Sequence, residues 1–372
     1  MIIKAEKSGT VENLKRIIDE TVANEAVKGI MILACDANGF TPEAVDDLLT
    51  STTIPVLGGI FPELIHGQEK LTKGNIVVGL LETPNVQIIP NLSDSTCDYD
   101  ELIDQKLPEL GKAQTMVVLV DGLSTRISAF IDSLFNIFGL EINFVGGGAG
   151  SLSLEQMPCL FSNEGLIQDS AILALLEAPS GIGVSHGWHS ISGPFQVTEV
   201  ERNVIKSLNW QPALDVYRQV VEQAAGQAIT QENFFDIAKG YPFGINRASS
   251  EKIVRDPIIA TEDGALVCVG EVPSESYVDI LSGDVNSLVN AAAHALELSR
   301  TDFQGNVTNS TALFFDCISR VLFLEDEFDQ ELQAVVRDGM PVVGALTLGE
   351  IANNGDDYLE FYNKTAVIAV LN

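Results

Sequence analysis

The sequence has few basic residues and few histidines, and both shortages exclude classes of function. Its 372 residues include 21 lysines and arginines against 52 aspartates and glutamates, which gives a net charge of −31. Nucleic acids and anionic membrane surfaces bind basic proteins, so we expect neither as the main partner. The four histidines are a thin supply of general bases near neutral pH, and this favours binding over catalysis.

Paired cysteines and long hydrophobic runs are also missing. The five cysteines are scattered and form no Cys-x-x-Cys pair, so neither a disulfide framework nor a metal site is expected. No run of about 18 apolar residues is present to span a bilayer. The first residues do not have the pattern of a signal peptide. We therefore expect a reduced, cytoplasmic protein.

What the sequence does contain is a strand–helix–strand pattern that occurs three times. In each occurrence an apolar strand ends at an aspartate, a helix-like stretch follows, a second strand runs into glycine, and a third apolar strand closes the unit. Such repeats place similar loops at similar strand ends, where ligands commonly bind. The nine strand segments are 29–36, 54–59 and 75–81; 115–121, 142–148 and 170–176; and 311–316, 340–344 and 365–371.

The hydrophobic pattern predicts the fold class. The repeated strands are apolar without a clean alternation, which is typical of strands covered on both faces by other layers. After residue 176 the pattern changes to turns, a hairpin and a helix that begins near Pro212. We predict an α/β or α+β protein whose two domains, 1–211 and 212–372, contain mixed sheets covered by helices.

The densest glycine cluster is a candidate ligand site. Gly146, Gly147 and Gly148 end a predicted strand, where backbone without side chains can offer its N–H groups to a ligand. A tight turn or a bulge in a sheet is the alternative. The cluster does not open a helix in the dinucleotide-binding spacing, and no phosphate-binding lysine follows it. We therefore expect no nucleotide cofactor and no other cofactor.

The third unit carries the residue types that bind a small carboxylate. Cys317 and Arg320 are three residues apart after an apolar strand, and on a helical turn they would share one side. Arg320 could clamp a carboxylate in fork geometry, or it could pair with an internal acid. Glu350 could position Arg320 or hold an amine. Arg255, at the end of another predicted strand, is the alternative clamp.

The order of these motifs along the chain resembles that of the FIST proteins, in which a FIST N domain precedes a FIST C domain. The resemblance implies a sensory, small-ligand-binding module of signalling proteins, with amino acids or related molecules as ligands. The matching stretches are Gly58-Gly59, residues 146–150, 170–176, 187–189, 212–217 and 241–244, Asp316-Cys-Ile-Ser-Arg320, and Gly349-Glu350-Ile351.

Three functions are therefore weighed. The first is a cytoplasmic receptor for an amino acid or similar carboxylate, bound by Arg320, Glu350 and the N–H groups of residues 146–148. The second is a thiol-dependent enzyme built on Cys317, although no histidine base lies near that residue in sequence. The third is an adaptor that binds a signalling protein or a further copy of this chain.

Overall fold

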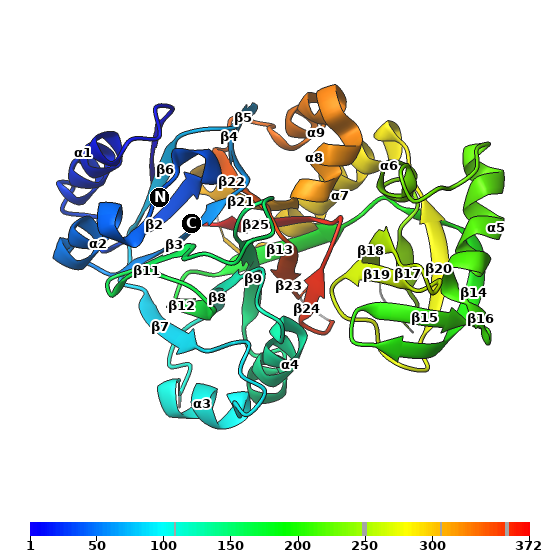
Figure 1. Ribbon diagram of the computed structural model, residues 1–372. Helices are drawn as coiled ribbons and strands as arrows, with labels where there is room; N and C mark the ends of the chain where they lie inside the picture. Colours follow the sequence, from blue (N-terminus) through cyan, green and yellow to red (C-terminus); the bar gives the residue numbers. More distant parts are fainter. Residues whose placement is uncertain (108, 248–250, 306, 354–356) are drawn as a thin grey trace.

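The chain folds into a large body made of three similar units and a smaller lobe inserted into the third unit (Figure 1). The computed structural model describes residues 1–107, 109–247, 251–305, 307–353 and 357–372. The body contains three six-stranded sheets, and the lobe is built on a seven-stranded sheet. The three sheets of the body are mixed and packed against helices, which confirms the predicted α/β class.

Each unit runs in the same order, from an edge strand through a helix, a central strand, a second helix, a second strand, a hairpin and a third strand. The first unit comprises β1 (Ile2–Glu6), α1 (Val11–Val22), β2 (Gly29–Cys35), α2 (Pro42–Ser51), β3 (Val56–Phe61), β4 (Glu63–His66), β5 (Glu69–Leu71) and β6 (Asn75–Leu80). The second comprises β7 (Asn85–Pro90), α3 (Tyr99–Lys106), β8 (Thr115–Asp121), α4 (Ile127–Phe138), β9 (Asn143–Ala149), β10 (Leu160–Ser162), β11 (Gly165–Ile167) and β12 (Ser170–Leu176).

The third unit follows this order but is interrupted by the lobe after its edge strand. It comprises β13 (Ser180–Ser185), α7 (Val285–Asp302), β21 (Thr311–Cys317), α8 (Ile318–Leu324), α9 (Phe328–Val335), β22 (Val342–Thr347), β23 (Glu350–Ala352), β24 (Glu360–Tyr362) and β25 (Ala366–Leu371). Short 3-10 turns are η1 (Asp36–Asn38), η2 (Val307–Asn309) and η3 (Glu325–Glu327).

Strand pairing confirms the predicted repeat. In each unit the central strand pairs in parallel with the second strand and antiparallel with the third. Thus β2 lies between β3 and β6, β8 between β9 and β12, and β21 between β22 and β25. The edge strand then pairs antiparallel with the third strand of the same unit.

The hairpins exchange between units in a cycle. The β4–β5 hairpin of the first unit pairs with β22 of the third, and the β23–β24 hairpin of the third pairs with β9 of the second. The β10–β11 hairpin of the second unit completes the cycle on β3 of the first. Each six-stranded sheet is therefore finished by another unit, which makes the three units interdependent.

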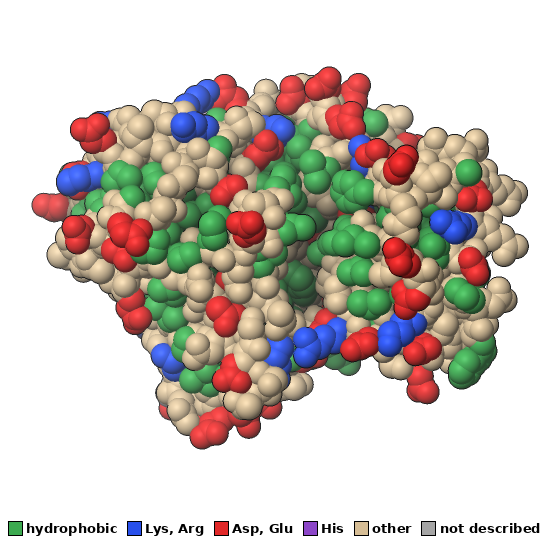
Figure 2. All heavy atoms as spheres, in the orientation of Figure 1, with side chains coloured by type: hydrophobic (Ala, Val, Ile, Leu, Met, Phe, Trp, Pro, Cys, Tyr) green, Lys and Arg blue, Asp and Glu red, His purple; other side chains and the backbone are tan. Residues whose placement is uncertain are grey.

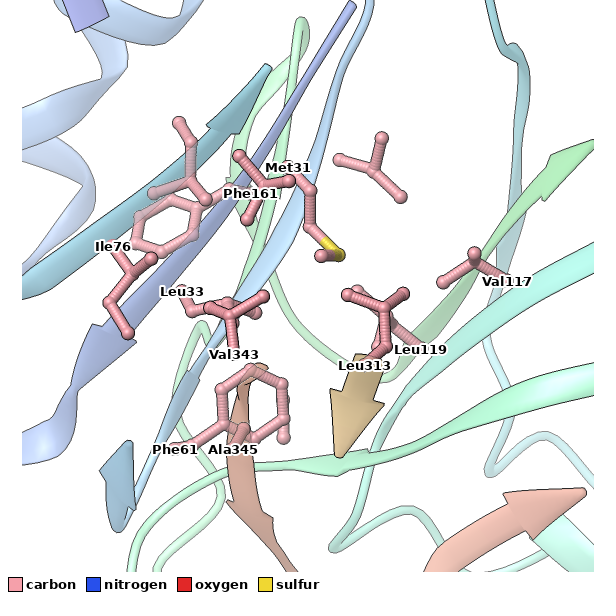
Figure 3. Close-up of a cluster of buried hydrophobic side chains, with 14 of the residues drawn as sticks. Met31, Leu33, Phe61, Ile76, Val117, Leu119, Phe161, Leu313, Val343 and Ala345 are labelled. Atoms are coloured by element: carbon pink, nitrogen blue, oxygen red, sulfur yellow. The ribbon is translucent and has the colours of Figure 1, made fainter. Parts of the chain in front are cut away.

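Alternate residues of the central strands enter different hydrophobic cores. Val117 and Leu119 of β8 join the core shared by the three units, whereas Val118 and Val120 join a separate core beneath α3 and α4. Figure 3 shows Met31, Val117 and Leu313, which occupy equivalent positions in β2, β8 and β21, meeting in the shared core. Because both faces of these strands are buried, their sequences show no alternation between apolar and polar residues.

The inserted lobe has its own core and lies beside the body (Figure 1). Its strand order is β14-β20-β17-β18-β19-β15-β16, and β14 also pairs with β15, which closes the sheet into a barrel. Its elements are β14 (His189–Glu201), β15 (Val204–Leu208), β16 (Gln211–Pro212), α5 (Ala213–Ala225), α6 (Phe234–Ala238), β17 (Phe243–Ile245), β18 (Ile253–Ala260), β19 (Leu266–Val269) and β20 (Tyr277–Ser282).

The predicted domain boundary at residue 211 falls within β16, which is part of the barrel. The division into domains 1–211 and 212–372 therefore stays a prediction, and it does not coincide with the border between body and lobe.

Among the described helices, none has the length and hydrophobicity needed to cross a membrane.

Three equivalent glycines allow the central and second strands to approach. Gly58, Gly146 and Gly344 pair with Ile32, Val118 and Phe314, respectively. A Cβ atom added at these glycines would lie 2.0, 1.8 and 1.7 Å from the carbonyl oxygen of the paired residue. These distances are far inside van der Waals contact, so no side chain fits at any of the three positions.

We predict that Gly344→Ala lowers the free energy of unfolding by about 3 kcal/mol, because β21 and β22 must separate to admit the methyl group. Gly240→Ala is the control: its Cβ would meet its nearest neighbour at 3.4 Å, so the change should stay within about 1 kcal/mol. Urea unfolding of both variants measures the difference, and equal midpoints would contradict the prediction.

Candidate functional site

A cavity of about 550 Å³ lies where the body meets the lobe. The body contributes the β8–α4 turn, the start of α8 and the β22–β23 turn, and the lobe contributes parts of β18, β19 and α6. In Figure 2 the hollow between the body and the lobe on the right is bordered by hydrophobic side chains. This size and apolar character are typical of small-molecule sites.

Two buried polar atoms on the cavity wall have no partner among the described residues. Asp256 and Asn363 both line the cavity and are at most 3% exposed. Asp256 Oδ2 lies 3.0 Å from Lys364 Nζ, but its Oδ1 accepts no hydrogen bond. The Nδ2 of Asn363 likewise has no acceptor. Buried polar groups are normally paired, so an unsatisfied acceptor and an unsatisfied donor on two residues that line one cavity make these side chains candidates for ligand contact.

Arg255 sets the orientation of the Asn363 amide. Arg255 Nη1 donates to Asn363 Oδ1 at 3.3 Å. A guanidinium can only donate, so the amide oxygen must face Arg255 and the NH₂ group must point away from it. Gly270 makes room for this contact, since an added Cβ would lie 3.0 Å from Arg255 Nε and 3.1 Å from Asn363 Oδ1. Arg255 thus fixes the orientation of the Asn363 amide and, with it, the direction of the Nδ2 donor.

The turn between β24 and β25 carries Asn363, Lys364 and Thr365, and all three are buried. Lys364 has a left-handed backbone with φ of 53°. Its ammonium donates to the carbonyl of Lys239 at 2.9 Å and lies 5.1 Å from the centre of the Trp188 ring. These contacts aim Lys364 at Asp256 of the lobe while Asn363 faces the cavity.

Charges around the two free atoms balance. Arg255 and Lys364 are basic, whereas Asp256 and Glu271 are acidic. Burial lowers the pKa of Arg255 to about 10, which leaves it protonated at neutral pH. Burial raises the pKa of Asp256, and the ammonium of Lys364 opposes that rise. The local sum is near zero, which suits a ligand head without net charge.

Arg320 serves the interior of the body and does not line the cavity. It is fully buried, and its Nε lies 3.0 Å from Asp316 Oδ1 while its Nη2 lies 2.6 Å from Glu331 Oε1. Its remaining N–H groups donate to three backbone carbonyls, those of His186, Leu288 and Lys364. None of the guanidinium N–H groups is left to bind a ligand carboxylate, so Arg320 is not part of the proposed site.

The predicted pairing of Glu350 with Arg320 does not form, because Asp316 and Glu331 take that place. Glu350 is fully buried, and its Oε1 accepts a hydrogen bond from Thr347 Oγ1 at 2.8 Å. Its Oε2 accepts from the backbone N–H of Thr365 at 3.3 Å. Glu350 therefore supports the 363–365 turn from behind.

The glycine cluster also lies behind the cavity wall. Gly146, Gly147 and Gly148 belong to β9 and sit between β8 and β23. The N–H of Gly148 donates to the carbonyl of Gly349 at 2.8 Å, so it is not free for a ligand. The cluster instead permits close packing against the β22–β23 turn, whose Leu348 and Gly349 do line the cavity.

Cys317 lines the cavity, as a thiol nucleophile would have to. Its Sγ lies 3.0 Å from Ser319 Oγ. Burial raises the pKa of the Cys317 thiol well above its ordinary value, and the nearby Glu350 carboxyl adds to this rise. A nucleophilic thiolate is therefore disfavoured at neutral pH, which argues against the thiol-dependent chemistry considered above.

We predict that iodoacetamide at pH 8 alkylates Cys317 at least about tenfold more slowly than Cys97, which is only half-buried. Peptide mass spectrometry of timed samples gives both rates, and urea-unfolded protein is the control in which the two should become similar. Faster alkylation of Cys317 than of Cys97 would contradict the burial argument.

Burial raises the pKa of Glu350 from 4.5 to about 8. Between these pH values the folded state holds a proton that the unfolded state releases, so stability should fall as pH rises, by at most about 1.4 kcal/mol per pH unit. We predict that Glu350→Gln reduces this fall between pH 5 and pH 8, and that Glu232→Gln on the surface does not. Urea unfolding at several pH values measures this, and parallel profiles for wild type and E350Q would refute it.

Sequence reasoning missed the two residues that carry the free atoms. Asp256 follows Arg255 directly, but an arginine was the expected carboxylate partner. Asn363 begins a polar triplet between the apolar strands β24 and β25. Polar residues at the same strand boundary of a repeated unit can be recognised in a sequence as candidate site residues. Only the structure shows which of their atoms lack hydrogen-bond partners.

Two family models match the chain in sequence. The model described as the FIST N domain matches residues 29–211, and the model described as the FIST C domain matches residues 213–353. The two ranges follow one another in the predicted order and together cover most of the chain. No curated protein matches it.

Proposed function

The chain belongs to the FIST family, whose domains are sensory domains in signal transduction, and we propose that it senses a small molecule bound in the cavity between body and lobe. The observation that carries this proposal is that Asp256 and Asn363, which both line the cavity, each hold a buried polar atom, Oδ1 and Nδ2 respectively, without a partner among the described residues.

The proposed ligand head is that of an amino acid. Its ammonium would donate to Asp256 Oδ1, and its carboxylate would accept from Asn363 Nδ2. A zwitterion carries no net charge, which matches the balance of Arg255 and Lys364 against Asp256 and Glu271. The arginine clamp expected from sequence is thereby replaced by an amide whose orientation Arg255 fixes.

The position of the cavity supports a sensory role. Asn363 belongs to the body, whereas Asp256 belongs to β18 of the lobe. A ligand held by both residues would link the two parts of the molecule. Its binding would therefore favour one relative position of the lobe and the body. A signalling partner that contacts both parts could read that change.

We predict that Asn363→Ala weakens binding of L-leucine or L-phenylalanine by about tenfold to a hundredfold, because it removes a hydrogen bond to a charged group. Isothermal titration calorimetry measures this. Asn353→Ala is the matched control: Asn353 is also buried, but both ends of its amide are bonded to the backbone outside the cavity. It should cost stability and leave affinity unchanged.

Native mass spectrometry of freshly purified protein complements the titration, because a retained metabolite would identify the head group directly. The proposal fails if neither amino acid binds and no small molecule is retained. It also fails if N363A binds the amino acids as tightly as the wild type does.

A further inference from the structure

We infer that the ligand carries a long apolar side chain and is an amphiphilic amino acid, not a small or polar one; this rests on the proposed function. The reason is an accumulation of exposed hydrophobic side chains at the mouth of the cavity. Leu152, Leu154, Phe235, Ile259 and Leu322 all line the cavity, and each is at least 37% exposed.

These five residues come from separate parts of the chain. Leu152 and Leu154 follow β9, Leu322 lies in α8, and Phe235 and Ile259 lie in the lobe. Although the chain has 52 acidic and 21 basic residues, apolar side chains gather at one place from both sides of the hollow (Figure 2). Exposed apolar clusters of this kind mark binding surfaces.

The size of the cavity agrees with a ligand that extends from the wall to the mouth. Its volume of about 550 Å³ exceeds what the two polar atoms of Asp256 and Asn363 need for a compact head. A neighbouring cavity shares Leu152 and Leu322 with this one, and it is also lined by the ion pairs Lys70–Glu63 and Lys239–Glu325. Those charges set the far limit of the apolar region.

The geometry therefore places the ammonium and carboxylate at the wall and the hydrocarbon chain along the apolar mouth. Burying a methylene group increases affinity about fourfold. Affinity should consequently rise with chain length until the chain reaches the charged region, where a further methylene gains nothing.

The test is a calorimetric titration with straight-chain L-α-amino acids of increasing length: alanine, 2-aminobutyrate, norvaline, norleucine and 2-aminooctanoate. We expect the dissociation constant to fall about fourfold for each methylene added. The double variant Leu154→Ser/Ile259→Ser should flatten this dependence for the longer members. Both residues are more than half exposed, so the substitution should leave folding intact.

The matched control is Leu140→Ser/Ile191→Ser, which changes two hydrophobic residues of similar exposure that do not line this cavity. It should leave the chain-length dependence as in the wild type. If the amino acids bind and N363A weakens them but affinity does not depend on length, this inference is overturned while the proposed function stands. If no member of the series binds, this inference is overturned; the proposed function falls with it only if L-leucine and L-phenylalanine also fail to bind and no small molecule is retained.

Discussion

The buried ion pair between Lys364 and Asp256 holds the two parts of the molecule together. A lysine ammonium removed from water must be matched by an opposite charge and by hydrogen-bond acceptors. Lys364 belongs to the body, whereas its carboxylate partner and the accepting carbonyl of Lys239 belong to the lobe. The pair therefore stabilises the arrangement in which the lobe lies against the body. It also places Asp256 and Asn363 on the same cavity wall.

Much of the body could be predicted from the sequence, since its repeat is written in local patterns. Apolar strands, intervening helices and glycines at the ends of second strands are visible without a structure, and the repeated unit and the mixed sheets were expected from them. The cyclic exchange of hairpins could not be predicted, because short strands such as β4 and β10 carry no signal for which sheet they join. The closure of the inserted barrel depends likewise on long-range pairing.

The site was harder to predict because it is defined by two polar atoms that have no hydrogen-bond partner among the described residues. Arg320 and Glu350 have polar groups that could bind a ligand, but these groups already form hydrogen bonds or ion pairs with neighbouring residues. Asn363 was not noticed, although its amide is available. Residue type shows what a side chain can bind, and only packing shows whether that capacity is already taken. Arg255 contacts Asn363 beside the cavity, and Cys317 lines the cavity.

The exchange of hairpins has a consequence for synthesis on the ribosome. Strand β4 emerges early, but its partner β22 lies near the other end of the chain, with Leu64 opposite Ala345. Until β22 has been synthesised, β4 offers an unpaired strand edge, which is prone to association with other chains. Closing so distant a contact is also slow in refolding. Nascent chains of this architecture should therefore depend on chaperones more than a protein with local pairing would.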